Sequence, residues 1–302
     1  MSRHLLSIMD LEKTEIDALL DRAVELKQRA AAGKRETALH GKCLGLLFDK
    51  ASTRTRLSFE TAMIRMGGQS IFISAADTQI ARGEPIRDTV RVMSGYLDGL
   101  IVRTYAQDTV REFAEWAEIP VISGLTDLYH PCQILSDLLT VVEKKGGYAG
   151  LKIAWVGDGN NVAHSWINAA ARLGFSLRLG CPEECFPNEA VLAAAREAGA
   201  DVEVLTDPAA AVEGADVLNT DVWASMGQED LLESRKQIFL PYQLNQGLLS
   251  HADSEAIVLH CLPAHREEEI TSEVLEGPQS AVWDQAENKM HLHKALLEML
   301  LA

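Results

Sequence analysis

The sequence predicts an α/β fold with two domains, each an open parallel sheet flanked by helices. Three observations predict it. Short apolar runs alternate with amphipathic segments along the whole chain, which is the pattern of βαβ units. The chain has 302 residues, 47% of them hydrophobic, which is enough to bury two cores. The alternation pauses at Gly146-Gly147, a helix stop signal, and then restarts.

The first half opens with a helix predicted over 11–29, with Asp10 as its N-cap. The run at 43–48 is apolar throughout, as in a strand buried on both faces of a parallel sheet. The segment 54–66 then carries apolar residues at helical spacing and ends at Gly67-Gly68. Further strands are predicted at 70–73, 99–102 and 120–122, and further helices at 86–96, 109–116 and 133–145.

The second half repeats the alternation and ends in a helix predicted over 287–300. We therefore expect a first domain over 1–146, a second over 147–286, and a C-terminal helix over 287–302. The strands predicted for the second domain are 152–156, 176–179, 202–205, 216–219 and 256–260.

Bulk properties exclude several classes of protein. The net charge of −16 argues against a nucleic-acid partner. No run is long and apolar enough to span a membrane, and the first residues lack a secretory signal, so no membrane partner is expected. Five cysteines without a dense framework suit a reducing cytosol, and we expect a cytoplasmic protein.

The run Ser52-Thr53-Arg54-Thr55-Arg56 lies where a predicted strand turns into a predicted helix. The first N–H groups of a helix lack partners and its dipole favours anions, while both arginines carry planar forks suited to phosphate. The run therefore indicates an anion site. An N-cap at Ser52 or Thr53 beside two solvated arginines explains it equally well.

The segment Gly157-Asp158-Gly159-Asn160-Asn161 also follows a strand and opens a helix, where a dinucleotide would bind. However, Val162 occupies the third glycine position, and no acidic residue ends the next strand. A nicotinamide-dependent dehydrogenase is therefore disfavoured. Asn161 is expected to direct its amide into the crevice beyond the strand ends.

Three polar residues in the first half indicate a site for a carbonyl or amide group. His130 and Gln133 begin a helix beside Pro131, and Arg103 follows the apolar strand 99–102. Histidine can donate to a carbonyl oxygen, and glutamine offers a donor and an acceptor to an amide. A capping histidine and an arginine in a structural ion pair remain alternatives.

Two loops in the second half carry further candidates. Asp221 follows a strand and can bind an ammonium group. A plain solvated loop is the alternative, although exposed Trp223 and Met226 would fit it poorly. Cys261 ends another strand, and its thiol can assist proton movement. Cys261 and His265 are four residues apart, but no second pair has metal spacing, so no metal site is expected.

Together these motifs resemble the aspartate/ornithine carbamoyltransferase family over nearly the whole chain. Ser-Thr-Arg-Thr-Arg and His-Pro-x-Gln are similar to motifs of both branches of the family. Asp-Val-Trp-x-Ser-Met-Gly and His-Cys-Leu-Pro are similar to the ornithine-specific branch. The resemblance implies that the first domain binds carbamoyl phosphate, the second binds the amino acid, and the last helix packs back on the first domain.

The resemblance also implies the role of each residue. Arg103, His130 and Cys261 would be catalytic. Gln79 would reach a neighbouring subunit's site, which implies a homo-oligomer, either a trimer or an assembly of trimers. The residues implied to bind carbamoyl phosphate are Ser52, Thr53, Arg54, Thr55, Gln79, Arg103, His130, Gln133, Cys261, Leu262 and Lys289. Those implied to bind ornithine are Asn161, Asp221, Ser225 and Met226.

The implied reaction transfers the carbamoyl group of carbamoyl phosphate to the δ-amine of L-ornithine and gives L-citrulline and phosphate. It would belong to arginine biosynthesis or, in reverse, to arginine catabolism, and it needs no cofactor. The alternative within the family is a carbamoyltransferase for putrescine or N-acetylornithine. Outside it, a non-catalytic binding protein with this fold is the remaining alternative.

One position departs from the resemblance. Family members usually carry arginine in a Glu-Asn-Arg stretch near the C-terminus, and this chain has Glu287-Asn288-Lys289. Lysine keeps the positive charge but lacks the planar fork, so a bidentate contact becomes a point-charge contact. We expect Lys289 to bind carbamoyl phosphate, but more weakly than arginine would.

Overall fold

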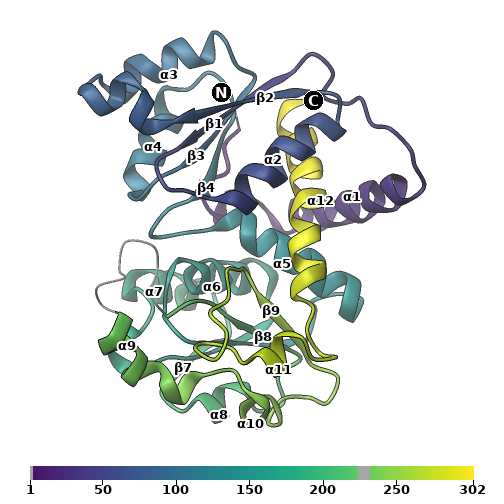
Figure 1. Cartoon of the computed structure of the whole chain (residues 1–302), viewed down its shortest axis with the longest axis vertical. Helices are drawn as coiled ribbons and strands as arrows, with labels where there is room; N and C mark the ends of the chain where they lie inside the picture. Colours follow the sequence, from purple (N-terminus) through teal and green to yellow (C-terminus); the bar gives the residue numbers. More distant parts are fainter. Residues whose placement is uncertain (1–2, 224–231) are drawn as a thin grey trace. The chain divides into compact units, whose positions relative to one another are not determined.

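The computed structural model describes residues 3–223 and 232–302, and its internal contacts divide the chain into two compact units. Unit 1 comprises Met1–Leu139 and Glu287–Ala302, and unit 2 comprises Thr140–Ala286. Both divisions fall inside helices, α5 (Pro131–Lys145) and α12 (Val282–Leu301) (Figure 1). The stop signal at Gly146-Gly147 thus marks the end of α5.

Unit 1 is built on four strands that all pair in parallel, in the order β2-β1-β3-β4. After β1 the chain adds β2 on one side of β1 and then adds β3 on its other side. The strand order therefore switches between β1 and β3. Open α/β sheets bind ligands at the carboxyl ends of the strands flanking such a switch. The strands are β1 (Cys43–Phe48), β2 (Gln69–Ser74), β3 (Gly99–Arg103) and β4 (Val121–Leu125).

The helices of unit 1 follow the strands as the alternation predicts. Register places Phe48 beside Arg103, so the turn from β1 into α2 and the end of β3 lie together. The helices are α1 (Lys13–Ala31), α2 (Thr53–Arg65), α3 (Ile86–Ser94), α4 (Gln107–Trp116) and the first part of α5.

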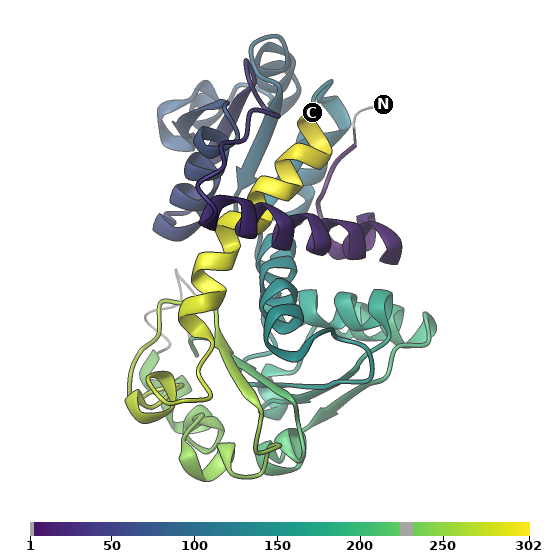
Figure 2. The ribbon, with the colours of Figure 1, turned by 90° about the vertical axis from the view of Figure 1, so that its right-hand side faces the viewer.

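The C-terminal helix packs on unit 1, as predicted. Its part from Glu287 onward lies against α1 and α2 (Figure 2). Lys27 donates to Asn288 over 2.7 Å, and the ring of His293 stacks on Phe59 with 3.6 Å between centroids. The helix begins at Val282, five residues before the predicted start, because Val282 is buried in the core of unit 2.

Unit 2 is built on five parallel strands in the order β7-β6-β5-β8-β9. The order switches between β5 and β8, so ligand-binding side chains are expected at the carboxyl ends of these strands. The strands are β5 (Lys152–Val156), β6 (Ser176–Gly180), β7 (Val202–Leu205), β8 (Val217–Thr220) and β9 (Ile257–His260). The helices are α6 (Asn161–Leu173), α7 (Glu189–Glu197), α8 (Pro208–Val212), α9 (Leu232–Phe239), α10 (Gln246–Leu249), α11 (Ser272–Leu275) and the start of α12.

One predicted cap is wrong. Helix α1 begins at Lys13, and Asp10 does not cap it. Its carboxylate accepts instead from the backbone N–H groups of Leu6 and Ser7, over 2.6 and 2.8 Å. This carboxylate belongs to the capping box of a short 3-10 turn, Ile8–Asp10, which the sequence pattern did not predict.

Among the described helices, none is long and apolar enough to cross a membrane.

Candidate active site

The N-terminus of α2 lies at the switch point of unit 1. Ser52 is the N-cap, since its hydroxyl accepts from the Thr55 N–H over 3.3 Å. Thr55 is 1% exposed, and its carbonyl accepts from the Ser58 hydroxyl over 3.0 Å. The cap and the anion site are therefore compatible, because a cap satisfies only one of the first N–H groups of a helix.

The two arginines of this turn have different surroundings. Arg56 bonds Glu60 over 3.0 Å, and its guanidinium lies 3.7 Å from the centre of the Phe72 ring. Arg54 is half-buried and forms no ion pair within the described part of the chain. Arg56 is engaged with Glu60 and Phe72, and Arg54 remains the candidate for binding an anion.

Arg103 and His130 are buried at the strand ends next to this turn, with 4% and 5% of their surfaces exposed. Burial lowers the pKa of His130 well below its ordinary value, and the positive charges of Lys289 and Arg103 lower it further. His130 is therefore neutral and can donate a hydrogen bond from a ring N–H, while Arg103 supplies the positive charge.

Gln133 and Lys289 meet although 156 residues separate them. The Lys289 ammonium donates to Gln133 Oε1 over 2.7 Å, and both side chains are buried. The other end of the amide, Gln133 Nε2, donates to Asp137 Oδ1 over 2.8 Å. Sequence reasoning missed Asp137; its position one turn after Gln133 on the same helix was the signal.

Two other predicted residues of unit 1 lie on its surface. Thr53 is exposed at the first position of α2, and Gln79 is exposed at the start of a 3-10 helix, Gln79–Arg82. Through the described part of the chain, the Gln79 side chain forms no hydrogen bond with the buried group of Arg103, His130 and Gln133.

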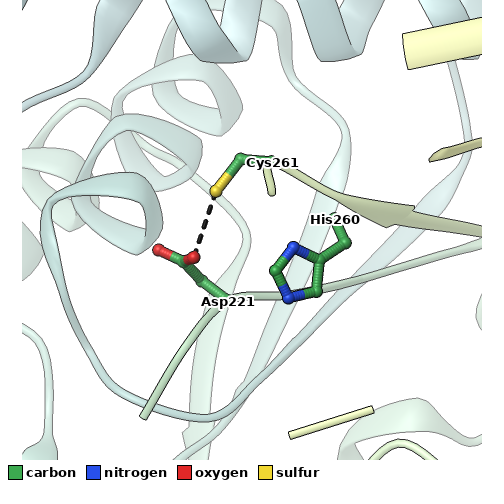
Figure 3. Close-up of side chains that lie close together, drawn as sticks. All are labelled: Asp221, His260 and Cys261. Carbon is green, nitrogen blue, oxygen red and sulfur yellow. Dashed lines mark hydrogen bonds between the residues drawn. The ribbon is translucent and has the colours of Figure 1, made fainter. Parts of the chain in front are cut away.

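In unit 2, Asp221 follows β8 directly and is 8% exposed. Its Oδ1 accepts from the Cys261 thiol over 3.1 Å, and Figure 3 shows the sulfur directed at this carboxylate. Its Oδ2 accepts from Asn160 Nδ2 over 3.0 Å. The register of β5, β8 and β9 brings these three residues to one edge of the sheet, as the switch point predicts.

The loop after β9 is held by a buried histidine and glutamate. His260 Nδ1 accepts from the Leu262 N–H over 2.9 Å, so the proton of this neutral ring is on Nε2, which donates to Glu269 Oε1 over 3.0 Å. Both side chains are fully buried. Leu262 has a left-handed φ of 57° and precedes a cis peptide bond to Pro263. The predicted Cys261 and Leu262 thus lie in a firmly anchored loop.

The glycine-rich turn after β5 packs against its own chain. A Cβ at Gly159 would lie 2.3 Å from the Pro187 nitrogen, so the close backbone approach explains the glycine without a dinucleotide. Asn160 caps α6, accepting from the Val162 N–H over 2.9 Å. Asn161 is the first residue of α6 and is half-buried.

Arg235, on α9, joins this turn to the end of the segment after β8. Its guanidinium donates to Asp158 Oδ2 over 2.9 Å and to the Trp223 carbonyl over 2.6 Å. Burial raises the pKa of Asp158, and Arg235 opposes that rise. Trp223 is 2% exposed and stacks on Phe239, which counts against the alternative of a plain solvated loop. Ser225 and Met226 lie outside the described residues.

Among the residues that the structure describes, two groups of possible metal ligands have their ligand atoms within 4.8 Å of one another. In the group of Asp221, His260 and Cys261, both imidazole nitrogens already have hydrogen-bond partners. A metal ion there would have to displace one of them. The second group is His265, Glu268 and Glu269, where Lys236 lies 3.1 Å from Glu268. The absence of a required metal stays a prediction.

The family models settle the class of protein. Residues 3–143 match the carbamoyl-P binding domain of aspartate/ornithine carbamoyltransferases, and residues 149–300 match their Asp/Orn binding domain. The chain belongs to the aspartate/ornithine carbamoyltransferase family, which confirms the resemblance of its motifs.

Similar proteins indicate which branch of this family the chain resembles. The chain is 56% identical to the ornithine carbamoyltransferase of Desulfotalea psychrophila and 55% identical to that of Syntrophus aciditrophicus, with 100% of each chain covered. The structure of ornithine carbamoyltransferase from Pyrococcus furiosus has 46% identity and a TM-score of 0.95, covering 99% of this chain and 97% of the other. The predicted fold class is confirmed.

Proposed function

We propose that this chain transfers the carbamoyl group of carbamoyl phosphate to the δ-amine of L-ornithine. The observation that carries the proposal is the grouping, in unit 1, of a capped helix N-terminus with buried Arg103, His130 and Gln133. Such a set suits a phosphate joined to a carbonyl and an amine. The similar relatives of this chain are named ornithine carbamoyltransferase, which favours ornithine as the substrate over putrescine or N-acetylornithine.

Different residues would bind the phosphate, the carbonyl oxygen and the amino group of carbamoyl phosphate. Its phosphate would occupy the N-terminus of α2, held by Ser52, Thr53, Arg54 and Thr55 and balanced by the charge of Lys289. Its carbonyl oxygen would accept from Arg103 and neutral His130, and its amino group would donate to Gln133 Oε1. Cys261 and Leu262 would flank the reacting atoms.

The reaction then follows from these groups. A neutral δ-amine attacks the carbonyl carbon, and the oxyanion that forms is stabilised by Arg103 and His130. Donors of this kind each contribute about 2.7–4 kcal/mol to the lowering of the barrier. Because His130 is neutral, it donates without adding a second full charge beside Arg103. Collapse breaks the bond to phosphate, which leaves into the helix N-terminus.

Ornithine would be held by unit 2. The Asp221 carboxylate suits an ammonium group, and Asn161, Ser225 and Met226 would fix the α-amino and α-carboxylate groups. The δ-amine has an ordinary pKa near that of lysine, about 10.4, and must lose a proton before it attacks. The Cys261 thiol, already bonded to Asp221, offers a path for that proton.

We infer a homo-oligomer, built as a trimer or an assembly of trimers, in which Gln79 serves a neighbouring subunit's site. Three large apolar side chains on α2 and the edge strand β2 support an interface there: Leu57, Ile64 and Ile71 are 56%, 68% and 51% exposed. Patches of this kind mark contact surfaces. The five cysteines are free thiols, which supports a location in the reducing cytoplasm. The proposed reaction is suited to arginine biosynthesis.

The functional division of the chain is proposed along the same lines. Residues 1–146, together with the C-terminal helix over 287–302, would form the carbamoyl phosphate-binding domain. Residues 147–286 would form the ornithine-binding domain. The family models support the boundary near residue 146, because their two matches carry these descriptions and end at 143 and begin at 149. The second match runs to residue 300, and the place of the C-terminal helix with the first domain is supported by its internal contacts with unit 1.

A citrulline colour assay tests the proposal. Carbamoyl phosphate is supplied with ornithine, putrescine, N-acetylornithine or aspartate in parallel reactions. We expect a ureido product with ornithine alone. Product from putrescine or N-acetylornithine but not from ornithine would refute the proposed substrate, and no product with any amine would refute the proposed activity.

A further inference from the structure

The Gln133 amide is held at both ends by charged side chains that are themselves buried. Asp137 is fully buried and Lys289 is 5% exposed. Gln133 Nε2 donates to Asp137 Oδ1 over 2.8 Å, and Lys289 Nζ donates to Gln133 Oε1 over 2.7 Å. These contacts join α5 to α12 within unit 1.

Only one orientation of the amide satisfies both neighbours. A carboxylate only accepts hydrogen bonds, so Asp137 can face only the NH₂ end of Gln133. An ammonium only donates, so Lys289 can face only the carbonyl end. Turning the amide over would place N–H groups against the ammonium and two oxygens against each other, without water to separate them.

We propose that Asp137 is a positioning residue that makes this site select a carbamoyl group, an inference that rests on the proposed function. With the amide fixed, Gln133 Oε1 keeps a second lone pair to accept from the carbamoyl NH₂. An acetyl group has nearly the same shape but carries a methyl group instead, so it gains nothing from this oxygen. Asp137 thus contributes to the discrimination between carbamoyl and acetyl phosphates without touching either.

The test is Asp137→Asn, which keeps the size of the side chain but removes the charge. Asparagine can donate as well as accept, so it no longer forbids the turned amide and forms a weaker bond to it. We expect the KM for carbamoyl phosphate to rise about fivefold, the difference between a charged and a neutral partner. The inhibition constant of acetyl phosphate, which competes for the same site, should change less than twofold.

A double-mutant cycle separates positioning from general support of the fold. If Asp137 acts through the amide, Asp137→Asn should leave the KM unchanged in a Gln133→Met background. Ser136→Ala is the matched control, because Ser136 is fully buried on the same helix and its hydroxyl donates to the Cys132 carbonyl over 2.8 Å. It should shift neither constant. Equal weakening of carbamoyl and acetyl phosphate in Asp137→Asn, or additive effects in the cycle, would overturn the inference.

Equilibrium binding keeps the inference separate from the proposed function. Calorimetry compares phosphonoacetamide, which carries the NH₂ group, with 2-oxopropylphosphonate, which carries a methyl group in its place. Asp137→Asn should weaken the first about fivefold and leave the second within twofold. If the wild-type chain makes no citrulline, the proposed function fails, whereas unchanged binding of both probes in Asp137→Asn refutes the role of Asp137 alone.

Discussion

Position 289 shows how one side chain changes the chemistry of a site. The Lys289 ammonium makes one contact with the Gln133 oxygen, over 2.7 Å, in buried surroundings. A guanidinium there would present several donors in one plane, matched to the oxygens of a phosphate. The weaker binding of carbamoyl phosphate that we expect with lysine therefore concerns this one side chain of the proposed site.

Lys289→Arg should therefore lower the KM for carbamoyl phosphate, by about threefold, since one added hydrogen bond contributes about 0.5–1.5 kcal/mol. Initial rates at saturating ornithine measure it. Lys27→Arg is the matched control, because Lys27 also bonds a residue of α12 over 2.7 Å but lies outside the site. An unchanged KM in Lys289→Arg would mean that position 289 does not contact the substrate.

His293 is a buried histidine with no catalytic role in the proposal. Its two ring nitrogens have no hydrogen-bond partner in the described chain, and its ring stacks on Phe59. Burial lowers its pKa well below the ordinary 6.5, with a further contribution from Lys289. The folded chain therefore leaves His293 unprotonated at a pH where the unfolded chain binds a proton.

The stability of the protein should consequently fall as the pH drops below 6.5, because the unfolded state then binds more protons than the folded state. One pH unit below that value, this single histidine costs about 1.4 kcal/mol. His293→Phe keeps the stack and removes the proton site, so urea unfolding at pH 7.5 and 5.5 should show a smaller loss. An equal loss in wild type and His293→Phe would contradict the explanation.

At the scale of elements, the two switch points position the candidate residues. The strand order of each sheet reverses once, between β1 and β3 in unit 1 and between β5 and β8 in unit 2. In each unit the first strand of that pair runs into a capped helix, α2 with Ser52 or α6 with Asn160. The polar side chains then gather at the strand ends because the parallel strands all end at one edge.

Ser52→Ala tests the double role of the first of these caps. Loss of the hydroxyl should destabilise the fold by about 1 kcal/mol and also raise the KM for carbamoyl phosphate, since Ser52 is proposed to bind the phosphate. Asn188→Ala is the matched control: Asn188 caps α7, accepting from the Ala190 N–H over 3.0 Å. It should cost the same stability and leave the KM unchanged. A KM unaffected by Ser52→Ala would assign Ser52 to capping alone.

At the scale of the whole molecule, Gln79 is exposed and, within the described residues, forms no hydrogen bond with Arg103, His130 or Gln133, although it is proposed to serve the same kind of site. A neighbouring subunit explains that position, and the apolar side chains of α2 and β2 provide a surface for it. Each site would then need two copies of the chain.

Co-expression of two inactive variants tests this arrangement. Gln79→Ala and Arg103→Ala should each abolish nearly all activity. Mixed oligomers should recover about one quarter of wild-type activity, since a site then combines Arg103 from one subunit with Gln79 from the next. Citrulline formation by the purified mixture measures it. If no activity returns although the mixed oligomers form, Gln79 and Arg103 belong to the same subunit's site.

A change at the apolar surface gives a second test. Ile64→Glu buries a charge in the proposed interface and should shift the mass in light scattering from three times 33.1 kDa, or a multiple of it, to 33.1 kDa. Leu240→Glu, at a leucine of unit 2 that is 60% exposed, should not change the mass. A mass of 33.1 kDa for the wild type would refute the oligomer.

The sequence by itself determined the α/β class, the strands and the motifs at their ends. This was possible because apolar runs, helical periodicity and polar residues at strand ends are local patterns, and Ser52, His130 and Cys261 each belong to one. The short helices α7, α8, α9, α10 and α11 were not predicted, because short helices depend on tertiary packing more than on their own pattern.

Only the tertiary structure decided which side chains meet. It brought Lys289 to Gln133, buried Asp137 beside them, placed Arg56 over the Phe72 ring, and buried Trp223. The physical reason is that these contacts depend on how faces of distant elements pack. A charge buried by such packing must find an opposite charge or a hydrogen-bond partner, and Gln133, one partner of Lys289, lies 156 residues away in the sequence.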